Sequence, residues 1–259
     1  MIDLLPEFSL WGIHFYTFPF VILFALAASV MTYLLAPQYK KFYCISVFRL
    51  FLPVLLGAAI GARLFSAITL LATSSQSFWH NLIYGGAVFY GGVIGGAIAL
   101  LITCRYQHRE FLVFSDLFVT LLPIGQAIGR LGCYCNGCCY GSQYDGILAV
   151  NYLVDGVYTT VFPTWFLEAG FCLILFLYFQ LFHRNNQTGI RSAIYLIAYS
   201  VYRFLIEFLR GDAIRGHLGR LSSSQIISIV LLIAGLCILF ICRRDKCNNF
   251  LFEEGEKKQ

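Results

Sequence analysis

The sequence predicts an all-α, polytopic membrane protein with about seven transmembrane helices, an external N-terminus and a cytoplasmic C-terminus. Hydrophobic residues make up 59% of the 259 residues and charged residues only 12%, a composition outside the usual range of soluble domains. The apolar residues fall in runs of about 20, which is the length that crosses a bilayer. One globular core does not explain so many long runs, so we expect a single integral-membrane domain over residues 1–259.

Seven apolar segments define the expected helices. They cover about 14–35, 47–71, 84–104, 112–131, 163–182, 190–209 and 225–242. The first residues, MIDLLPEF, contain two acidic side chains and no basic region, so they do not predict a cleavable signal peptide. The longest connection is a small extracytoplasmic loop region at about 132–162.

The distribution of Lys and Arg predicts the orientation of these helices. Twelve of the 18 basic residues fall on one side of a seven-helix arrangement, and basic loops favour the cytoplasmic side. The net charge of +5 therefore needs no nucleic-acid partner, because most of it faces anionic lipid. The twelve residues are Lys40, Lys41, Arg49, Arg105, Arg109, Arg184, Arg191, Arg243, Arg244, Lys246, Lys257 and Lys258.

The second and third segments combine one arginine with a run of glycines. Arg63 lies within the second segment, in the half expected nearer the external face. GGAVFYGGVIGG, residues 85–96, opens the third segment with six glycines, and small residues at such spacing favour close helix packing. Tyr90 lies among them, and its hydroxyl is better suited to hydrogen bonding than to acting as a base.

The fourth segment ends in PIGQAIGRLGCYCNGCCYG, residues 123–141. We expect its glycines to interrupt the helix end, because glycine permits tight turns and close approach to a ligand. Arg130 offers a planar fork of five donors that suits a phosphate, and Asn136 adds a neutral donor and acceptor. A helix-terminating loop with an arginine that reaches the headgroups is the alternative.

The fifth and sixth segments carry further charges. Glu168 lies near the start of the fifth segment. In VYRFLIEFLRGD, residues 201–212, Arg203, Glu207 and Arg210 are spaced so that they would share one face of a helix. Ionised groups inside a bilayer are costly unless they are paired or reach water. We therefore expect Arg63, Arg130, Glu168, Arg203 and Glu207 to face one shared polar cavity, with separate ion pairing and snorkelling as the alternative.

Four cysteines crowd the turn after the fourth segment: Cys133, Cys135, Cys138 and Cys139. A tetrahedral zinc site usually draws its ligands from two separated pairs, which this spacing fits poorly. A disulfide is possible in an oxidising compartment, and inert small residues remain the default. The sequence thus predicts neither a metal nor a cofactor, and its histidines offer no imidazole base within the membrane.

Together these motifs resemble the prolipoprotein diacylglyceryl transferases of bacteria, in length, in topology and in most of the chain between residues 57 and 230. The glycine–arginine–asparagine stretch is the most specific part, followed by the Arg203–Glu207–Arg210 pattern. The matching segments are IGARLF (60–65), GGAVFYGGVIGG (85–96), SDL (115–117), PIGQAIGRLGCYCNG (123–137), FPTWFLE (162–168), YSVYRFLIEFLRGD (199–212) and SSSQIISI (222–229).

The resemblance implies an enzyme of the bacterial plasma (inner) membrane. Such enzymes transfer the diacylglyceryl group of phosphatidylglycerol to the lipobox cysteine of a preprolipoprotein signal peptide, which yields a thioether and glycerol 1-phosphate. No cofactor, metal or nucleic acid is implied. By motif, the resemblance implies catalytic roles for Arg130, Arg203, Glu207, Tyr90 and Tyr199, and phosphatidylglycerol binding by Arg63, Arg130, Asn136, Arg203 and Arg210.

This set of residues fits the implied chemistry. Arginines would hold the phosphate and stabilise the charge that develops on its oxygen. A thiol is only slightly ionised at neutral pH, so nearby arginines and a base would help to form the attacking thiolate. We expect Arg203 and Arg210 to face the phosphate and Glu207 to orient them.

Two departures from the family pattern keep other interpretations open. Tyr90 stands where many members have a histidine, which removes the obvious base for the thiol, although tyrosine also occurs in members with a GCCYG turn. FPTWFLE replaces an H-P-[ST]-Q-L-Y-E run, of which Pro163, Thr164 and Glu168 remain. The alternatives are a non-catalytic paralogue that binds lipid or signal peptides and, with less support because no internal repeat is evident, an anionic-lipid transporter.

Overall fold

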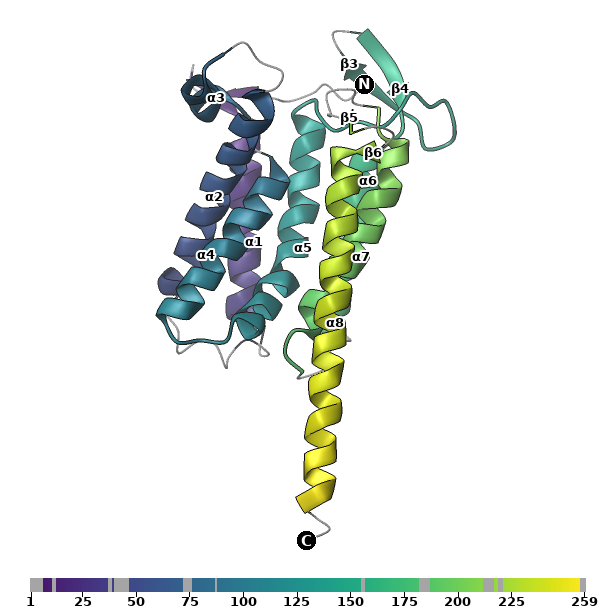
Figure 1. Ribbon diagram of the computed structural model, residues 1–259. Helices are drawn as coiled ribbons and strands as arrows, with labels where there is room; N and C mark the ends of the chain where they lie inside the picture. Colours follow the sequence, from purple (N-terminus) through teal and green to yellow (C-terminus); the bar gives the residue numbers. More distant parts are fainter. Residues whose placement is uncertain are drawn as a thin grey trace. The chain divides into compact units, whose positions relative to one another are not determined.

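The computed structural model describes residues 7–10, 13–36, 39, 47–71, 76–86, 88–154, 157–181, 187–211, 217–218 and 221–256. Over these residues the chain is mainly helical, and seven of the helices are long and apolar enough to cross a membrane (Figure 1). The expected all-α, polytopic class is therefore confirmed. The chain forms a first unit of Met1–Leu35 with Phe118–Gln259 and a second unit of Ala36–Leu117.

The second unit is built around two long helices, α2 (Val47–Leu71) and α4 (Phe89–Tyr106), with the short helix α3 (Phe78–Tyr84) between them in sequence. Glycines let the backbones of α2 and α4 approach closely. A Cβ atom added at Gly95 would collide with the carbonyl oxygen of Gly57, and one at Gly91 with that of Gly61. Gly91 and Gly95 of the third expected segment are thus packing residues, as the spacing predicts.

The first unit contains α1 (Thr17–Leu35), most of α5 (Phe111–Cys135), α6 (Thr164–Leu181), α7 (Ile190–Ile206) and α8 (Ser223–Glu256). Helices α7 and α8 run side by side, and α8 continues well past the end of its neighbour (Figure 1). A 3-10 turn, η2 (Glu207–Leu209), follows α7 directly.

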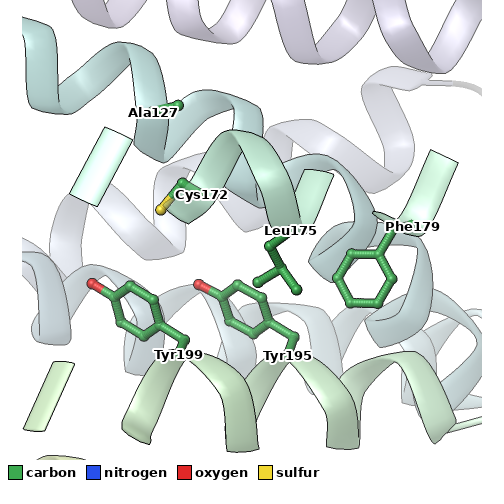
Figure 2. Packing of buried hydrophobic residues seen from close by; sticks show 6 residues of the cluster. All are labelled: Ala127, Cys172, Leu175, Phe179, Tyr195 and Tyr199. Atoms are coloured by element: carbon green, nitrogen blue, oxygen red, sulfur yellow. The ribbon is translucent and has the colours of Figure 1, made fainter. Parts of the chain in front are cut away.

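A buried cluster from α5, α6 and α7 forms the core of the first unit. It consists of Ala127, Cys172, Leu175, Phe179, Tyr195 and Tyr199 (Figure 2). The two tyrosine rings stack on one face of α7, with centroids 5.7 Å apart, and their hydroxyl groups point the same way. The polar ends of these rings meet the side chains that make up the candidate site.

Among the residues that the structure describes, three antiparallel strand pairs supplement the helices: β1 (Glu7–Leu10) with β2 (Ile13–Tyr16), β3 (Val150–Val154) with β4 (Val157–Val161), and β5 (His217–Leu218) with β6 (Leu221–Ser222). The second hairpin lies in the connection between α5 and α6. Its Tyr152 and Val161 pack with Trp165 of α6 in a second buried cluster. This hairpin therefore holds the connection against the start of α6.

The helix bounds differ from several of the expected segments. The first helix begins at Thr17 instead of residue 14, because Ile13–Tyr16 form β2, and the last covers Ser223–Glu256 instead of 225–242. The expected helix 47–71 matches α2, but α4 begins only at Phe89, after Gly85 and Gly86. The glycines of the fourth segment do not interrupt the helix where expected, because α5 runs on to Cys135. The sixth expected segment matches the apolar span Ile190–Leu209, in which the α-helix ends at Ile206 and η2 forms the last three residues.

Five of the basic residues that predict the orientation lie outside the described residues: Lys40, Lys41, Arg184, Lys257 and Lys258. The external N-terminus and cytoplasmic C-terminus remain a prediction from the sequence.

Candidate active site

An ion pair joins α5 and α6 at the centre of the candidate site. Arg130 Nη2 lies 2.6 Å from Glu168 Oε1, and only 15% and 3% of the two side chains are exposed. The same carboxylate oxygen accepts a hydrogen bond of 3.1 Å from the Tyr199 hydroxyl of α7. A buried ion pair needs such additional hydrogen bonds to offset the loss of water. Glu168 thus fixes an arginine and a tyrosine from two other helices.

A second polar layer lies one helical turn away and repeats this arrangement with neutral groups. The Tyr195 hydroxyl donates to Gln126 Oε1 at 2.9 Å, and the Cys172 thiol lies 3.9 Å from the same oxygen. Each of these residues is four positions from its counterpart in the ion-paired layer, on the same helix face. The two layers fix the rotation of α5, α6 and α7 about their axes.

Arg203 extends the polar face of α7 by a further turn. Its Nη1 lies 2.7 Å from Glu207 Oε2, and its Nη2 donates to Ser224 Oγ of α8 at 3.1 Å. The side chains of Arg203 and Glu207 are only 4% and 8% exposed. The expectation that Glu207 orients Arg203 therefore agrees with their direct contact.

A capping box at the start of α8 positions Ser224. The Ser222 hydroxyl accepts from Gln225 N at 3.2 Å, while Gln225 Oε1 accepts from Ser222 N at 3.0 Å. This reciprocal pair satisfies two backbone donors at the helix N-terminus. The SSSQ sequence thereby explains why α8 begins here and presents Ser224 to Arg203.

Arg210 does not lie on the helical face that its spacing predicts, and this expectation is wrong. The α-helix ends before it, and Arg210 itself has an extended backbone with φ −85° and ψ 141°. Arg210 instead forms an antiparallel bridge with Gly141, supported by bonds from Ser142 N to Leu209 O and from Gly211 N to Tyr140 O. Arg210 thus lies on the extended segment after η2, which pairs with the segment that follows α5.

The chain changes direction in the turn that follows α5, where two residues have positive φ angles. Gly137 has φ 73° and Cys139 has φ 63°, a conformation that is unusual for a residue with a Cβ atom. Two side chains at the start of α6 hold the turn: Trp165 Nε1 donates to Cys138 O at 2.6 Å, and Thr164 Oγ1 donates to Cys139 O at 2.8 Å. Asn136 lies on the exposed side of this turn.

Electrostatic interactions connect the turn with the arginines. Hydrogen bonds from Cys133 and Cys138, and then the charges of Arg210 and Arg130, lower the pKa of the Cys139 thiol. The two guanidinium groups therefore act on the same turn. A separate effect concerns Tyr152, whose pKa is raised by burial and whose hydroxyl donates to Tyr134 O at 2.7 Å.

Arg63 and Tyr90 belong to the second unit. Arg63 is exposed and donates from Nη1 to Ile83 O at 2.7 Å and to Gly85 O at 3.4 Å, so it caps the C-terminal end of α3. The Tyr90 hydroxyl is buried and has no hydrogen-bond partner among the described residues. The place of Arg63 in a shared polar cavity and the role of Tyr90 in catalysis remain predictions.

Sequence reasoning did not assign Glu168 to the catalytic set, although it noted the charge. The signal was present, since an acidic residue inside an apolar segment is costly without a partner. What the sequence could not supply was the partner, because Arg130 and Tyr199 are 38 and 31 residues away. Gln126 and Ser224 were missed for the same reason.

Comparison with known proteins places the chain in a family. The sequence profile of the prolipoprotein diacylglyceryl transferase family matches residues 6–241. The chain is 29% identical to phosphatidylglycerol–prolipoprotein diacylglyceryl transferase 2 of Clostridium perfringens (strain 13 / Type A), over 96% of this chain and 98% of that protein. It is 30% identical to the phosphatidylglycerol–prolipoprotein diacylglyceryl transferase of Clostridium tetani (strain Massachusetts / E88), over 92% and 98%.

A third relative, the enzyme of the same name from Clostridioides difficile (strain 630), is 34% identical over 67% of this chain and 68% of that protein. The match to the family profile covers all five elements that form the polar network, from α5 to the start of α8. The chain is a multi-pass membrane protein that belongs to the prolipoprotein diacylglyceryl transferase family.

Proposed function

We propose that this protein transfers the diacylglyceryl group of phosphatidylglycerol to the lipobox cysteine thiol of preprolipoproteins. The observation that carries the proposal is the buried network in which Glu168 joins Arg130 and Tyr199. Such a network fixes a guanidinium group inside an apolar bundle, where it can bind an anionic headgroup. The names of the relatives specify the same lipid and a prolipoprotein acceptor.

In this reaction the sulfur of the acceptor cysteine attacks the diacylglyceryl carbon that carries the phosphate oxygen. An S–C bond forms, the C–O bond breaks, and the phosphate leaves with its glycerol as glycerol 1-phosphate. Negative charge grows on the departing oxygen, so a guanidinium group fixed beside it lowers the barrier. The thiol gives up its proton as the thiolate forms, and over the whole reaction this proton ends on the released phosphate monoester.

Arg130 is the residue best suited to hold the phosphate. Its contact with Glu168 engages one guanidinium nitrogen, whereas a guanidinium group has five N–H donors in a planar fork. The fork can therefore bind Glu168 and a phosphate oxygen at the same time. Glu168 and Tyr199 keep it in this orientation, and we assign them positioning roles.

Arg203 and Arg210 supply further positive charge in the same unit. Arg203 is enclosed by Glu207 and Ser224, so it would act mainly through its charge and by fixing the end of α7. Arg210 and Arg130 both act electrostatically on Cys139, and this shared neighbour supports a common positive field beside the turn. Asn136, Arg63 and Tyr90 remain candidate contacts to the substrates.

The orientation of the chain in the membrane is a second part of the proposal. We infer an external N-terminus, a cytoplasmic C-terminus and a location in the bacterial plasma (inner) membrane, because most basic residues fall on one side. The connection between α5 and α6 would then be extracytoplasmic. That side is where the lipobox of an exported precursor would reach the enzyme.

One assay tests the function directly. The purified full chain is incubated with phosphatidylglycerol vesicles and a peptide that carries a lipobox cysteine, and both glycerol phosphate and the peptide mass are measured. The proposal predicts glycerol phosphate release together with a mass gain of one diacylglyceryl unit. A cysteine-to-serine peptide serves as the matched control and should remain unmodified.

The two alternative functions give different results in this assay. A paralogue that only binds lipid or signal peptide would leave both substrates unchanged under conditions in which a related transferase is active. A transporter would move labelled phosphatidylglycerol across the vesicle bilayer without releasing glycerol phosphate. Either result would reject the proposed transfer.

A further inference from the structure

Three of the four cysteines at the end of α5 and in the turn after it bring their sulfur atoms together. The Sγ atoms of Cys133, Cys138 and Cys139 all lie within 4.8 Å of one another, and all three residues are partly buried. Sulfur ligands of a tetrahedral zinc ion are about 3.8 Å apart, given a Zn–S distance of about 2.3 Å. The three sulfurs thus need to contract by about 1 Å at most to meet that geometry.

The backbone holds the three cysteines in this arrangement. Cys138 N donates to Cys133 O at 3.2 Å, which closes the turn between the end of α5 and the second pair of thiols. Trp165 and Thr164 fix the carbonyl groups of Cys138 and Cys139. The left-handed φ of 63° at Cys139 is a strained conformation for a residue with a side chain and such strain is concentrated at functional sites.

The charges around the turn also suit a thiolate site. Three thiolates and one divalent cation carry a net charge of about −1, which an isolated, partly buried site would tolerate poorly. The guanidinium groups of Arg210 and Arg130 act on Cys139, and Arg130 acts on Cys133 as well. Because Arg130 is already paired with Glu168, Arg210 is the main positive charge set against the excess negative charge of the ligands.

We propose that Cys133, Cys138 and Cys139 form a three-thiolate binding site for one soft cation of the Zn²⁺ or Cu⁺ class. Thiolate ligands select such cations over hard ones such as Mg²⁺. Each thiol gives up a proton as its sulfur binds the ion. Three protein ligands leave one tetrahedral position for water or another ligand.

The bound ion would fasten the last turn of α5 to the segment that pairs with Arg210. Cys139 is two residues before Gly141, whose backbone bridges Arg210. The site therefore stabilises a turn beside the transfer site, and none of its three ligands is assigned to the transfer. Its metal binding can be tested without an activity assay.

Cys135, the last residue of α5, provides a matched control. It is also a free cysteine, but it is outside the group whose sulfur atoms converge. The substitutions Cys133→Ser, Cys138→Ser and Cys139→Ser each remove one proposed ligand, whereas Cys135→Ser removes none. Thermal unfolding of each metal-free variant shows whether it is folded before binding is measured.

The experiment measures binding of Zn²⁺ to the reduced, full-length protein in detergent, by competition with a chromophoric chelator. Co²⁺ in a parallel sample reports thiolate ligation through charge-transfer absorption. We expect one Zn²⁺ per chain for the natural protein and Cys135→Ser. Removal of a residue that only hydrogen-bonds to a metal ligand lowers metal affinity by roughly 10–100-fold. Each variant that lacks a ligand should lose more Zn²⁺ affinity than that.

Two results would overturn the site. The first is equal affinity in the natural protein and in folded ligand variants, or an equal loss in Cys135→Ser. The second is a disulfide between two of the three cysteines in protein prepared without reductant, found by mass spectrometry after thiol alkylation. A zinc-dependent rise in Tm that is confined to the natural protein and Cys135→Ser would support the site.

Discussion

Arg130 and Glu168 form an ion pair of 2.6 Å between α5 and α6, although they are 38 residues apart in the chain. The contact joins two charges that would each be unfavourable in an apolar bundle. It also places a guanidinium group beside a carboxylate that Tyr199 holds from a third helix. If this network positions Arg130 for an anionic substrate, its disruption lowers transfer as well as stability; if it only stabilises the bundle, stability alone falls.

Replacement of Glu168 by Gln should destabilise the protein and reduce transfer. The variant removes the negative charge and leaves Arg130 largely buried without a counter-charge. Breaking a buried ion pair in this way typically lowers the free energy of unfolding by about 3–5 kcal/mol. Thermal unfolding in detergent measures the effect on stability. A double-mutant cycle with Arg130→Met should give a coupling energy of about 0.5–3 kcal/mol, and strict additivity would contradict the ion pair.

Two tyrosines on α7 offer a matched comparison. Tyr199→Phe removes a hydrogen bond to a carboxylate, whereas Tyr195→Phe removes one to an amide. Hydrogen bonds to charged groups are stronger than those to neutral groups. We therefore expect the free energy of unfolding to fall by about 1–2 kcal/mol in Tyr199→Phe and by about 0.5–1 kcal/mol in Tyr195→Phe. In the transfer assay kcat/KM should fall several-fold more for Tyr199→Phe, and equal values for the two variants would argue against a special role of Tyr199.

Close packing of α2 against α4 predicts different effects of two neighbouring glycines. A Cβ atom at Gly95 would meet the carbonyl oxygen of Gly57, whereas one at Gly92 would be 3.5 Å from the nearest atom, Ala58 O. Gly95→Ala should therefore lower stability by about 1–3 kcal/mol. Gly92→Ala should leave Tm nearly unchanged, and a reversed order in thermal unfolding would contradict this packing.

The buried hydroxyl of Tyr90 can be removed without loss of a described hydrogen bond. Tyr90→Phe should therefore leave Tm nearly unchanged. If the hydroxyl contacts a substrate, as the family resemblance implies, the same variant should weaken transfer by about tenfold, the effect of one lost hydrogen bond of about 1.4 kcal/mol. Tyr106→Phe, at a residue that is 87% exposed, is the control, and unchanged kcat/KM in Tyr90→Phe would exclude this contact.

The transmembrane segments could be predicted from the sequence because length and hydropathy are local properties. The bounds of α2 were predicted to the residue, and those of α6 differ by one residue at each end. The polar residues of the site were also evident, since charges inside apolar segments are costly without partners. Their partners were not, because contacts between helices depend on how each helix is rotated.

Arg210 shows where the sequence pattern misleads. Its spacing from Arg203 and Glu207 fits a continuous helix, but the helix ends at Ile206 and η2 redirects the chain. The bridge between Arg210 and Gly141 then decides its position. Likewise, cysteine spacing did not reveal which thiols converge, because the left-handed residues Gly137 and Cys139 fold the turn back.

Glycerol phosphate release by arginine variants tests the central claim most directly. Arg130→Ala and Arg203→Ala should each lower kcat/KM by at least about 100-fold, which corresponds to about 2.7 kcal/mol of lost transition-state stabilisation. The control is Arg243→Ala, at an exposed residue of α8, and it should retain the activity of the natural protein. If folded Arg130→Ala releases glycerol phosphate and modifies the lipobox peptide at the natural rate, the phosphate is not held by the guanidinium group that Glu168 positions.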